Sequence, residues 1–375
     1  MSITRDDTID AVVVGAGPAG LAVSRELQHL GLQHAVLERG DSVGYTWAHL
    51  YDSLVLHTGR HLSSLPGLTF PASTPLFPTR LQFLDYLRRY AETFHLPVET
   101  RVDVTHTEAQ TDRWLVHARD GSTRTARALI IATGIVANPY TPDLPGRDQF
   151  RGRLMHSVDY HRPADTLGRR VLVAGTGNSA GEISAELAAA GAEVTLAVRT
   201  GATIVPREVL GVPVQYLGII FSPLPPSARA AITRGFSRLT GLARGKAVLP
   251  PPQRTECPKI PLIGLALADG IRAGKIRVRP GLAGFTAARV VFSDGSEDEF
   301  DDVILATGYR AAVSPLRSLI GVDSCGFANR RGPVASADRR GLYFVGHTYS
   351  TDGALLNIGR DARRAARAIR QEIAH

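Results

Sequence analysis

A glycine-rich turn occurs twice in this chain, each time after a short apolar run. The first copy is Gly15-Ala16-Gly17-Pro18-Ala19-Gly20 after Val12–Val14, and the second is Gly175-Thr176-Gly177-Asn178-Ser179-Ala180 after Val171–Ala174. This pattern is typical of a buried parallel strand that leads into a helix. The first glycine permits the turn, the second lets the backbone approach a pyrophosphate, and the third position packs the helix on the strand. Two such turns predict two dinucleotide sites, and therefore electron transfer between a flavin and a nicotinamide.

The residues around the first turn predict a strand–helix–strand unit. Ile9–Val14 has the pattern of a strand, Ala19–Leu30 that of a helix, and Ala35–Leu37 that of a second strand. Glu38 follows this second strand at the place, about 20 residues after the turn, where an acidic side chain reaches the ribose hydroxyls of an adenosine. A surface glutamate is the alternative, but the preceding turn favours ribose binding.

The residues around the second turn repeat this plan with one difference. Val171–Ala174 leads into the turn, Glu182–Ala190 is a predicted helix, and Val194–Val198 is the next strand. This strand ends at Arg199 instead of an acid. Arginine pairs with a 2′-phosphate in bidentate fashion, whereas an acid repels it. Arginine is frequent in the chain, so chance is the alternative, but the position favours NADPH over NADH.

Each unit closes with a similar buried strand. Leu129–Gly134 and Val303–Gly308 both end in Ala-Thr-Gly. A plain buried strand with a turn glycine explains either run alone, whereas two runs at matching places indicate a repeated domain. Leu342–Gly346 is predicted to be a further buried strand, and a long helix is predicted from about Leu355 towards Ile373.

The expected fold class is therefore α/β, with two Rossmann-like dinucleotide-binding domains. The FAD-binding domain is expected to be discontinuous, because the chain returns to it after Gly308. We expect an irregular, proline-rich insert with an apolar stripe around Ala228–Leu239. This insert either covers a substrate entrance or contacts a membrane surface, or it is a solvated excursion packed on the second domain. The expected boundaries are residues 1–149 and 309–375 for the FAD domain, and 150–308 for the NADPH domain with its insert at about 205–261.

Composition and cysteine spacing exclude several function classes. The net charge of +8 raises the question of nucleic acid, but the arginines are scattered along the whole chain, so no nucleic-acid partner is expected. No apolar run reaches the roughly 18 residues of a membrane span, and no signal peptide pattern is present, so we expect a cytoplasmic protein.

Cys257 and Cys325 form no Cys-x-x-Cys pair that would serve as a dithiol relay. His57 and His61 lack an acidic or cysteine partner, so no metal is expected. A homo-oligomer is compatible with the sequence.

A longer motif lies between the two units. Residues 150–160 read Phe-x-Gly-x-x-x-His-x-x-x-Tyr, with His156 and Tyr160 at the last two fixed positions. This resembles the fingerprint of the flavin-containing monooxygenases, which precedes the NADPH-binding turn. Baeyer–Villiger relatives carry tryptophan at the last position, so Tyr160 separates the chain from them. Runs similar to the YUCCA-like branch of this family cover nearly the whole chain: Val36–Arg39, Trp47, Tyr51–Leu54, Leu56–His57, Phe70–Pro71, Phe77–Arg80, Gln82–Leu87, Gly177–Ser179, Glu182, Val198–Arg199 and Pro206–Glu208.

The resemblance implies an FAD- and NADPH-dependent monooxygenase that acts on a small-molecule substrate and O2. In this family NADPH reduces FAD, O2 adds at flavin C4a to give a hydroperoxide, and one oxygen atom enters the substrate. YUCCA-like enzymes oxidatively decarboxylate indole-3-pyruvate, so an aromatic 2-oxo acid is the leading candidate. The alternatives are N- or S-oxygenation, an NADPH-dependent flavin reductase or oxidase that releases H2O2, and a non-enzymatic flavin-binding protein. Departures from the branch at Ala180, Thr255–Lys259 and Gly346–Tyr349 concern the substrate more than the cofactors.

The site residues follow from the motifs and the resemblance. Since the flavin carries the chemistry, no catalytic residue is assigned; His156 is expected to support coupling and to position the nicotinamide nucleotide. The residues expected to bind FAD are Gly15, Gly17, Pro18, Ala19, Gly20, Glu38, Arg39, Trp47, Thr133, Gly134, Gly346 and Leu356. Those expected to bind NADPH are Gly175, Gly177, Asn178, Ser179, Ala180, Arg199, Thr200, Arg207, His156, Thr307 and Gly308.

Overall fold

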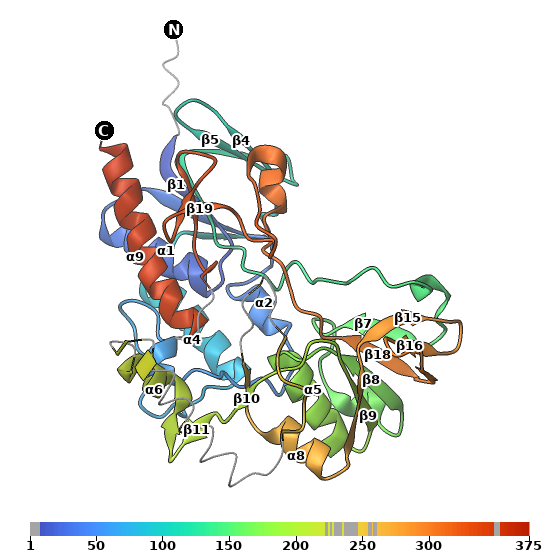
Figure 1. Ribbon diagram of the computed structural model, residues 1–375. Helices are drawn as coiled ribbons and strands as arrows, with labels where there is room; N and C mark the ends of the chain where they lie inside the picture. The colour runs from blue at the N-terminus through green and yellow to red at the C-terminus, as the bar shows by residue number, and fades with distance from the viewer. Residues whose placement is uncertain are drawn as a thin grey trace. The chain divides into compact units, whose positions relative to one another are not determined.

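The chain divides into two compact units in the computed structural model of Figure 1. One unit comprises Met1–Asn138 and Tyr309–His375, and the other comprises Pro139–Gly308. The structure describes residues 8–221, 224–225, 227–228, 235, 247–253, 257, 261–348 and 353–374.

The first unit is built on a sheet whose central strands are parallel. β1 (Ile9–Val14) has β6 (Thr123–Ile131) and then β21 (Leu342–Phe344) on one side, and β2 (His34–Glu38) and then β3 (Val98–Thr100) on the other. Antiparallel strands extend this sheet beside β6 and beside β21. They are β4 (Val104–Ala109), β5 (Trp114–Ala118), β19 (Arg330–Arg331) and β20 (Ala335–Ser336).

The register of the central strands brings their carboxyl ends to one edge of the sheet. Val14 lies beside Leu37 of β2 and beside Ile131 of β6. Phe344 of β21 also lies beside Ile131. The glycine-rich turn after β1, the acid that ends β2 and the residues after β6 and β21 therefore share one edge, where α/β sheets bind their ligands.

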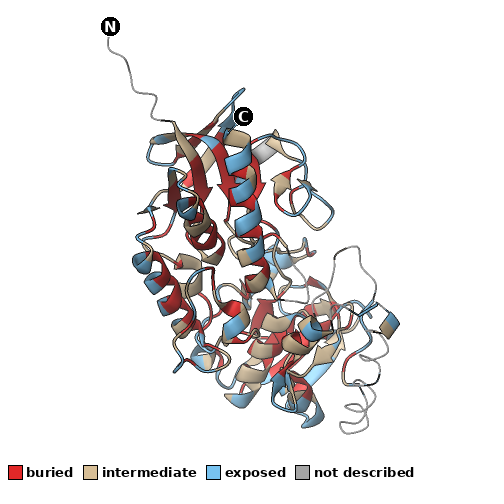
Figure 2. Cartoon of the chain, turned by 90° about the vertical axis from the view of Figure 1, so that its left-hand side faces the viewer, coloured by how far each residue is buried: buried red, intermediate tan, exposed pale blue. Residues whose placement is uncertain are grey.

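Helices cover one face of this sheet. Side chains alternate between faces along a strand, so Val13 and Ile130 face the layer formed by α1 (Pro18–His29), α4 (Arg80–Thr93) and α9 (Ala354–Ile373). The opposite face packs on β4, β5 and η3 (Ser314–Leu319). Figure 2 shows the buried strands in red beside α9, whose buried and exposed residues form separate stripes. The two further short helices of this unit are α2 (Tyr45–Ala48) and α3 (Arg60–Ser63).

The second unit contains a five-stranded parallel sheet. Its order is β14 (Ile276–Pro280), β9 (Glu193–Val198), β8 (Arg170–Ala174), β18 (Asp302–Leu305) and β7 (Arg153–His156). Outside the insert, this unit also contains η1 (Arg147–Gln149), η2 (Pro163–Thr166), α5 (Asn178–Ala189), α8 (Ala266–Arg272), β15 (Leu282–Phe285), β16 (Val290–Phe292) and β17 (Glu297–Asp298).

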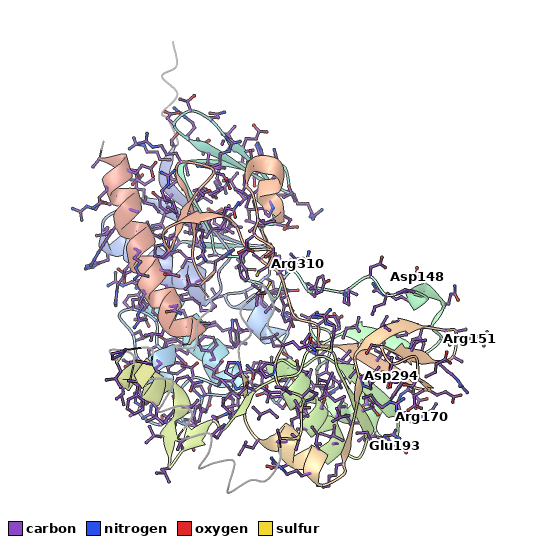
Figure 3. All side chains as sticks on the ribbon, in the orientation of Figure 1. Asp148, Arg151, Arg170, Glu193, Asp294 and Arg310 are labelled. Carbon is purple, nitrogen blue, oxygen red and sulfur yellow. The ribbon has the colours of Figure 1, made fainter. Side chains whose placement is uncertain are left out.

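An ionic cluster fixes the amino ends of the strands in this second sheet. Asp302 is fully buried and accepts hydrogen bonds from Arg153 Nε at 2.7 Å and Arg169 Nε at 2.6 Å. Arg170 forms ion pairs with Glu299 and Asp301 at the same edge, where Glu193 is its register neighbour on β9 (Figure 3). These charges lie at the amino ends of the strands, whereas the glycine-rich turn follows the carboxyl end of β8 at the opposite edge.

The insert consists of short elements where it is described. β10 (Ile204–Val205) pairs with β13 (Leu262–Ile263), β11 (Glu208–Val209) pairs with β12 (Val212–Pro213), and α6 (Val214–Ile220) follows. The apolar stripe predicted around Ala228–Leu239 lies largely outside the described residues, as does most of Thr255–Lys259.

The fold class predicted from the sequence, α/β with two Rossmann-like units, is confirmed. The strand predicted over Ile9–Val14 is β1, with the same bounds. The helix predicted over Glu182–Ala190 begins earlier, at Asn178, because Gly177 is already its extended N-cap residue. Within the described residues, none of the helices combines the length and apolar character that crossing a membrane requires.

Candidate functional site

The first glycine-rich turn is pressed against the neighbouring strand. Gly15 has φ 105°, and a Cβ atom there would lie 2.7 Å from the Ala132 carbonyl oxygen. A Cβ atom on Gly20 would lie 1.8 Å from the Gly15 carbonyl oxygen. Both glycines are therefore required by the protein itself, because they let β1, β6 and α1 approach closely.

Gly17 is different, since no contact among the described residues explains it. Its backbone is extended (φ −81°, ψ −173°), a conformation open to any residue, and no atom of the described part of the chain lies within 4 Å of a Cβ placed there. Gly177 repeats this geometry with φ −85° and ψ 179°, again with no described atom within 4 Å of such a Cβ. Each open space adjoins the N-terminus of a helix, whose free N–H groups attract phosphate oxygens. Pro18, at the first position of α1, leaves this end preformed. The two turns therefore fit two dinucleotide pyrophosphates.

Glu38 closes the first turn from the next strand. Its side chain is buried, and Oε2 accepts a hydrogen bond from the Ala16 N–H at 2.7 Å. Oε1 accepts one from the Gly40 N–H at 2.9 Å. A carboxylate has about four lone-pair sites, so each oxygen can still accept a ribose hydroxyl. The spacing pattern predicts the ribose contact, but it gives no sign of the bond to Ala16.

The last segment of the chain lies beside this turn. A Cβ atom on Gly346, which follows β21 after Val345, would lie 3.0 Å from the Ala19 Cβ. Thr133 Oγ1 donates to the Ala312 carbonyl at 2.6 Å, which joins the residues after β6 to the returning chain. The structure thus brings these expected FAD residues, and Gly134 next to them, to one edge.

The remaining expected FAD residues differ in exposure. Trp47 in α2 is half-buried, with its ring 4.5 Å from that of Phe83 at an angle of 75°. Leu356 is half-buried near the start of α9, whereas Arg39 is exposed. The ring contact with Phe83 therefore fixes the orientation of the Trp47 side chain.

The second turn is held in a similar way. Gly175 has φ 141°, and a Cβ atom there would lie 2.2 Å from the Ala306 carbonyl oxygen. Asn178 Oδ1 accepts a hydrogen bond from the Ile263 N–H at 2.7 Å, so this side chain anchors the insert. Ser179 is half-buried and Ala180 is fully buried, so the methyl group of Ala180 is accommodated inside the unit.

Arginines lie after the strand next to this turn. Arg199 is exposed at the carboxyl end of β9, where a 2′-phosphate is read in such folds. A Cβ atom on Gly281 would lie 3.0 Å from the Cα of Arg199, so the segment around Gly281 packs directly on the backbone of Arg199. Arg207 Nη2 lies 3.6 Å from Glu182 Oε1 on α5, and Thr200 is half-buried.

His156 bonds to its own unit through both ring nitrogens. The Val158 N–H donates to Nδ1 at 3.2 Å, so the proton lies on Nε2, which is 3.1 Å from the Gly308 carbonyl oxygen and donates to it. Burial lowers the pKa of His156, and the bond to Gly308 opposes this shift only in part. Thr307 Oγ1 donates to the Tyr140 carbonyl at 2.5 Å. A neutral His156 therefore fixes the end of the second Ala-Thr-Gly run.

The other fixed positions of the fingerprint brace the same unit. The Tyr160 hydroxyl is 2.9 Å from Glu186 Oε2 of α5, and Tyr160 is buried. The Phe150 ring lies 5.0 Å from that of Phe285, and a Cβ atom on Gly152 would lie 2.5 Å from Phe150 Cζ. The spacing of the motif singles out these positions, but the bond to Glu186 is visible only in the structure.

Comparison of the sequence with known proteins gives matches over nearly its whole length. The sequence profile of the pyridine nucleotide-disulphide oxidoreductase family matches residues 12–208. The indole-3-pyruvate monooxygenase YUCCA1 of Oryza sativa subsp. japonica is 35% identical, over 94% of this chain and 90% of its own. The probable indole-3-pyruvate monooxygenase YUCCA1 of Arabidopsis thaliana is 33% identical, over 95% and 88%.

Comparison of the structure with solved structures gives a similar result. A flavin-containing monooxygenase from Stenotrophomonas maltophilia superimposes with a TM-score of 0.78 at 28% identity, over 97% of this chain and 99% of that one. Cyclohexanone monooxygenase from Rhodococcus sp. Phi1, bound to NADP+, has a TM-score of 0.74 at 20% identity, over 98% and 85%. The second likeness concerns the fold alone.

Proposed function

This chain belongs to the YUCCA-like branch of the flavin-containing monooxygenases, within the pyridine nucleotide-disulphide oxidoreductase family, and from that membership we propose its substrate class and the roles of its residues. It is an FAD- and NADPH-dependent monooxygenase. Its substrate is an aromatic 2-oxo acid such as indole-3-pyruvate. The similarity to the rice indole-3-pyruvate monooxygenase, which spans 94% of this chain, is the observation that carries this proposal.

The proposed reaction is an oxidative decarboxylation. The bond between the carbonyl carbon and the carboxylate of the 2-oxo acid breaks, and CO2 leaves. One atom of O2 enters the new carboxylate and the other becomes water, while NADPH supplies the two electrons and a proton from solvent completes the balance. The NADPH and O2 are those of the cytoplasm, where we place the reaction.

FAD is assigned to the first unit. The open space at Gly17 receives the pyrophosphate, Glu38 holds the adenosine ribose, and Trp47 adjoins the bound dinucleotide. The orphan N–H groups at the start of α1 add a positive potential at the phosphate. The remaining FAD contacts are those expected at Gly15, Pro18, Ala19, Gly20, Arg39, Thr133, Gly134, Gly346 and Leu356.

NADPH is assigned to the second unit. Gly177 receives its pyrophosphate, and the exposed Arg199 pairs with its 2′-phosphate. His156 acts indirectly in this proposal, because its hydrogen bond holds the Gly308 carbonyl in the segment that follows β18. The remaining NADPH contacts are those expected at Gly175, Asn178, Ser179, Ala180, Thr200, Arg207 and Thr307.

Bound FAD, once reduced by NADPH, supplies the activation of O2, which no side chain can perform. The chain's own residues bind and orient the nucleotides. The hydrogen bonds of His156 support this division of roles. Both of its ring nitrogens are engaged, so the imidazole has no free site for proton transfer to a substrate.

The test supplies indole-3-pyruvate, phenylpyruvate, a thioether and a tertiary amine in parallel to the purified protein with NADPH. We expect CO2 and the shortened acid from the oxo acids, in proportion to the NADPH consumed. Efficient S- or N-oxide formation without decarboxylation would overturn the substrate proposal. Gly17→Val should abolish flavin retention by filling the open space, and a full flavin spectrum in this variant would refute the assignment of FAD to this turn.

A further inference from the structure

A short helix lies between the first glycine-rich turn and α4. The Gly44 N–H donates to the Ala16 carbonyl at 3.0 Å, which ties this segment to the turn. Gly44 has φ 72°, and a Cβ atom there would lie 2.9 Å from Leu84 Cδ1 of α4. The helix that follows, α2, has four residues, Tyr45–Ala48, and carries Trp47. A single turn of helix is unstable by itself, so other contacts must hold α2 in place.

The side chain of Arg80 supplies such contacts. Arg80 Nη1 donates to the Ala48 carbonyl at 2.6 Å and lies 3.4 Å from that of Trp47. Arg80 Nη2 donates to Asp52 Oδ1 at 2.9 Å. The last carbonyls of a helix lack partners within the helix and form its negative end, so a guanidinium there both satisfies and neutralises them. Arg80 therefore caps the C-terminus of α2 from another helix.

Arg80 is itself held rigidly. It is the first residue of α4, whose N-terminus is fixed by a capping box formed by Thr79 and Gln82. Its N–H donates to the Leu54 carbonyl at 2.8 Å, and its side chain is only 9% exposed. Arginine is almost never fully buried unless paired, because removing the charge from water is costly. By contrast, Arg88 in the same helix is exposed.

We propose that Arg80 is a positioning residue for FAD, which fixes α2 so that Trp47 and the backbone at Gly44 adjoin the dinucleotide. The bond from Gly44 to Ala16 carries this effect to the glycine-rich turn. The inference rests on the proposed binding of FAD by the first unit. The competing explanation is that Arg80 only adds stability to the fold.

The experiment measures FAD binding by folded apoprotein in four variants: Arg80→Met, Arg80→Lys, Arg88→Met and Tyr90→Phe. Flavin is removed, and the FAD dissociation constant is measured by titration alongside the melting temperature. Tyr90→Phe is the stability control, because it removes a buried hydrogen bond of 2.5 Å from α4 to the Pro66 carbonyl, away from α2. Arg88→Met is the control for loss of a charge from the same helix.

Arg80→Met should raise the FAD dissociation constant at least tenfold. Arg80→Lys should recover only part of this loss, because a point-like ammonium cannot reproduce the planar fork that serves Ala48 and Asp52 together. Both controls should bind FAD within twofold of the original chain. In a Trp114→Phe background, Trp47 is the remaining tryptophan, and its emission in the apoprotein should shift to the red when Arg80 is replaced by methionine.

An Arg80→Met variant that melts like Tyr90→Phe and keeps the original FAD affinity would overturn the inference and leave the stability explanation. If Arg80→Met does not fold, Arg80→Lys decides, since its affinity must then be at least threefold weaker than that of Arg88→Met. Failure of the proposed function is recognised separately, because the original apoprotein would then bind no FAD or Gly17→Val would bind it normally.

Discussion

Replacement of Glu38 by glutamine tests the closed turn of the first unit most directly. Glu38 is 8% exposed, and its two oxygens accept backbone hydrogen bonds of 2.7 Å from Ala16 and 2.9 Å from Gly40. Glutamine keeps one acceptor oxygen but turns an NH2 group towards the other N–H. Hydrogen bonds to a charged group contribute about 1.5–3 kcal/mol each, so at least one such contribution is lost.

The loss should appear in FAD affinity as well as in stability. If the Ala16 bond is the one broken, the turn loosens where the pyrophosphate binds, and the carboxylate charge is no longer available to the ribose. A loss of about 1.5–3 kcal/mol corresponds to an FAD dissociation constant that is roughly ten- to a hundredfold larger. The assay is a titration of apoprotein with FAD, in which binding is monitored by the quenching of flavin fluorescence. The melting temperature of the apoprotein is measured alongside.

Glu99→Gln is the matched control. Glu99 lies on the adjacent strand β3 and forms an ion pair of 2.6 Å with Arg124, in which both side chains are more than a third exposed. Exposed pairs contribute about 0–1 kcal/mol, so FAD binding should stay unchanged in this variant. Glu38→Gln with the original FAD affinity would refute the reasoning, because the turn would then not depend on this carboxylate.

Three further predictions concern single residues. Arg199→Ala should remove most of a preference for NADPH of roughly ten- to a hundredfold, and leave NADH use nearly unchanged in steady-state kinetics; equal losses for both nucleotides would mean that Arg199 is structural. His156→Ala should retain FAD but release more H2O2 per NADPH, because the Gly308 carbonyl keeps the Tyr140 N–H but loses the His156 side chain as a donor; loss of flavin with unchanged coupling would contradict this. Burial lowers the pKa of His347 from 6.5 to about 4. As the pH falls below 6.5, this histidine therefore binds a proton in the unfolded chain but not in the folded chain. His347 should therefore cost about 2 kcal/mol of stability between pH 7 and pH 5, and the fall in melting temperature over that range should be smaller in His347→Phe; equal falls would place the titration elsewhere.

Much of the fold and of the candidate site could be predicted from the sequence, because its signals are local. The run Ile9–Val14, the turn that follows it and Glu38 lie within one short stretch, where apolar periodicity and glycine positions act directly on the backbone. The same holds for the second turn and Arg199. The fingerprint is also local, so its spacing and its place between the two turns indicate the family without any tertiary contact.

The contacts that hold these residues in place depend on tertiary structure. Arg80 caps α2 across 32 residues of sequence, and Gly346 packs on Ala19 across almost the whole chain. The helical period places Arg80 on the same face of α4 as the buried Phe83 and Leu87, whereas Arg88 lies on the exposed face. The period gives no sign that the Arg80 guanidinium bonds to the Ala48 carbonyl, because that contact depends on where the neighbouring segment packs.

The sequence by itself thus determined that two glycine-rich turns exist, each between a buried strand and a helix. Only the tertiary structure decided that Glu38 bonds to the Ala16 N–H and that His156 gives both ring nitrogens to its own unit. The physical reason is that a turn or a strand is selected by neighbours in the chain, whereas a side-chain hydrogen bond is selected by whichever buried polar group lies within reach after packing.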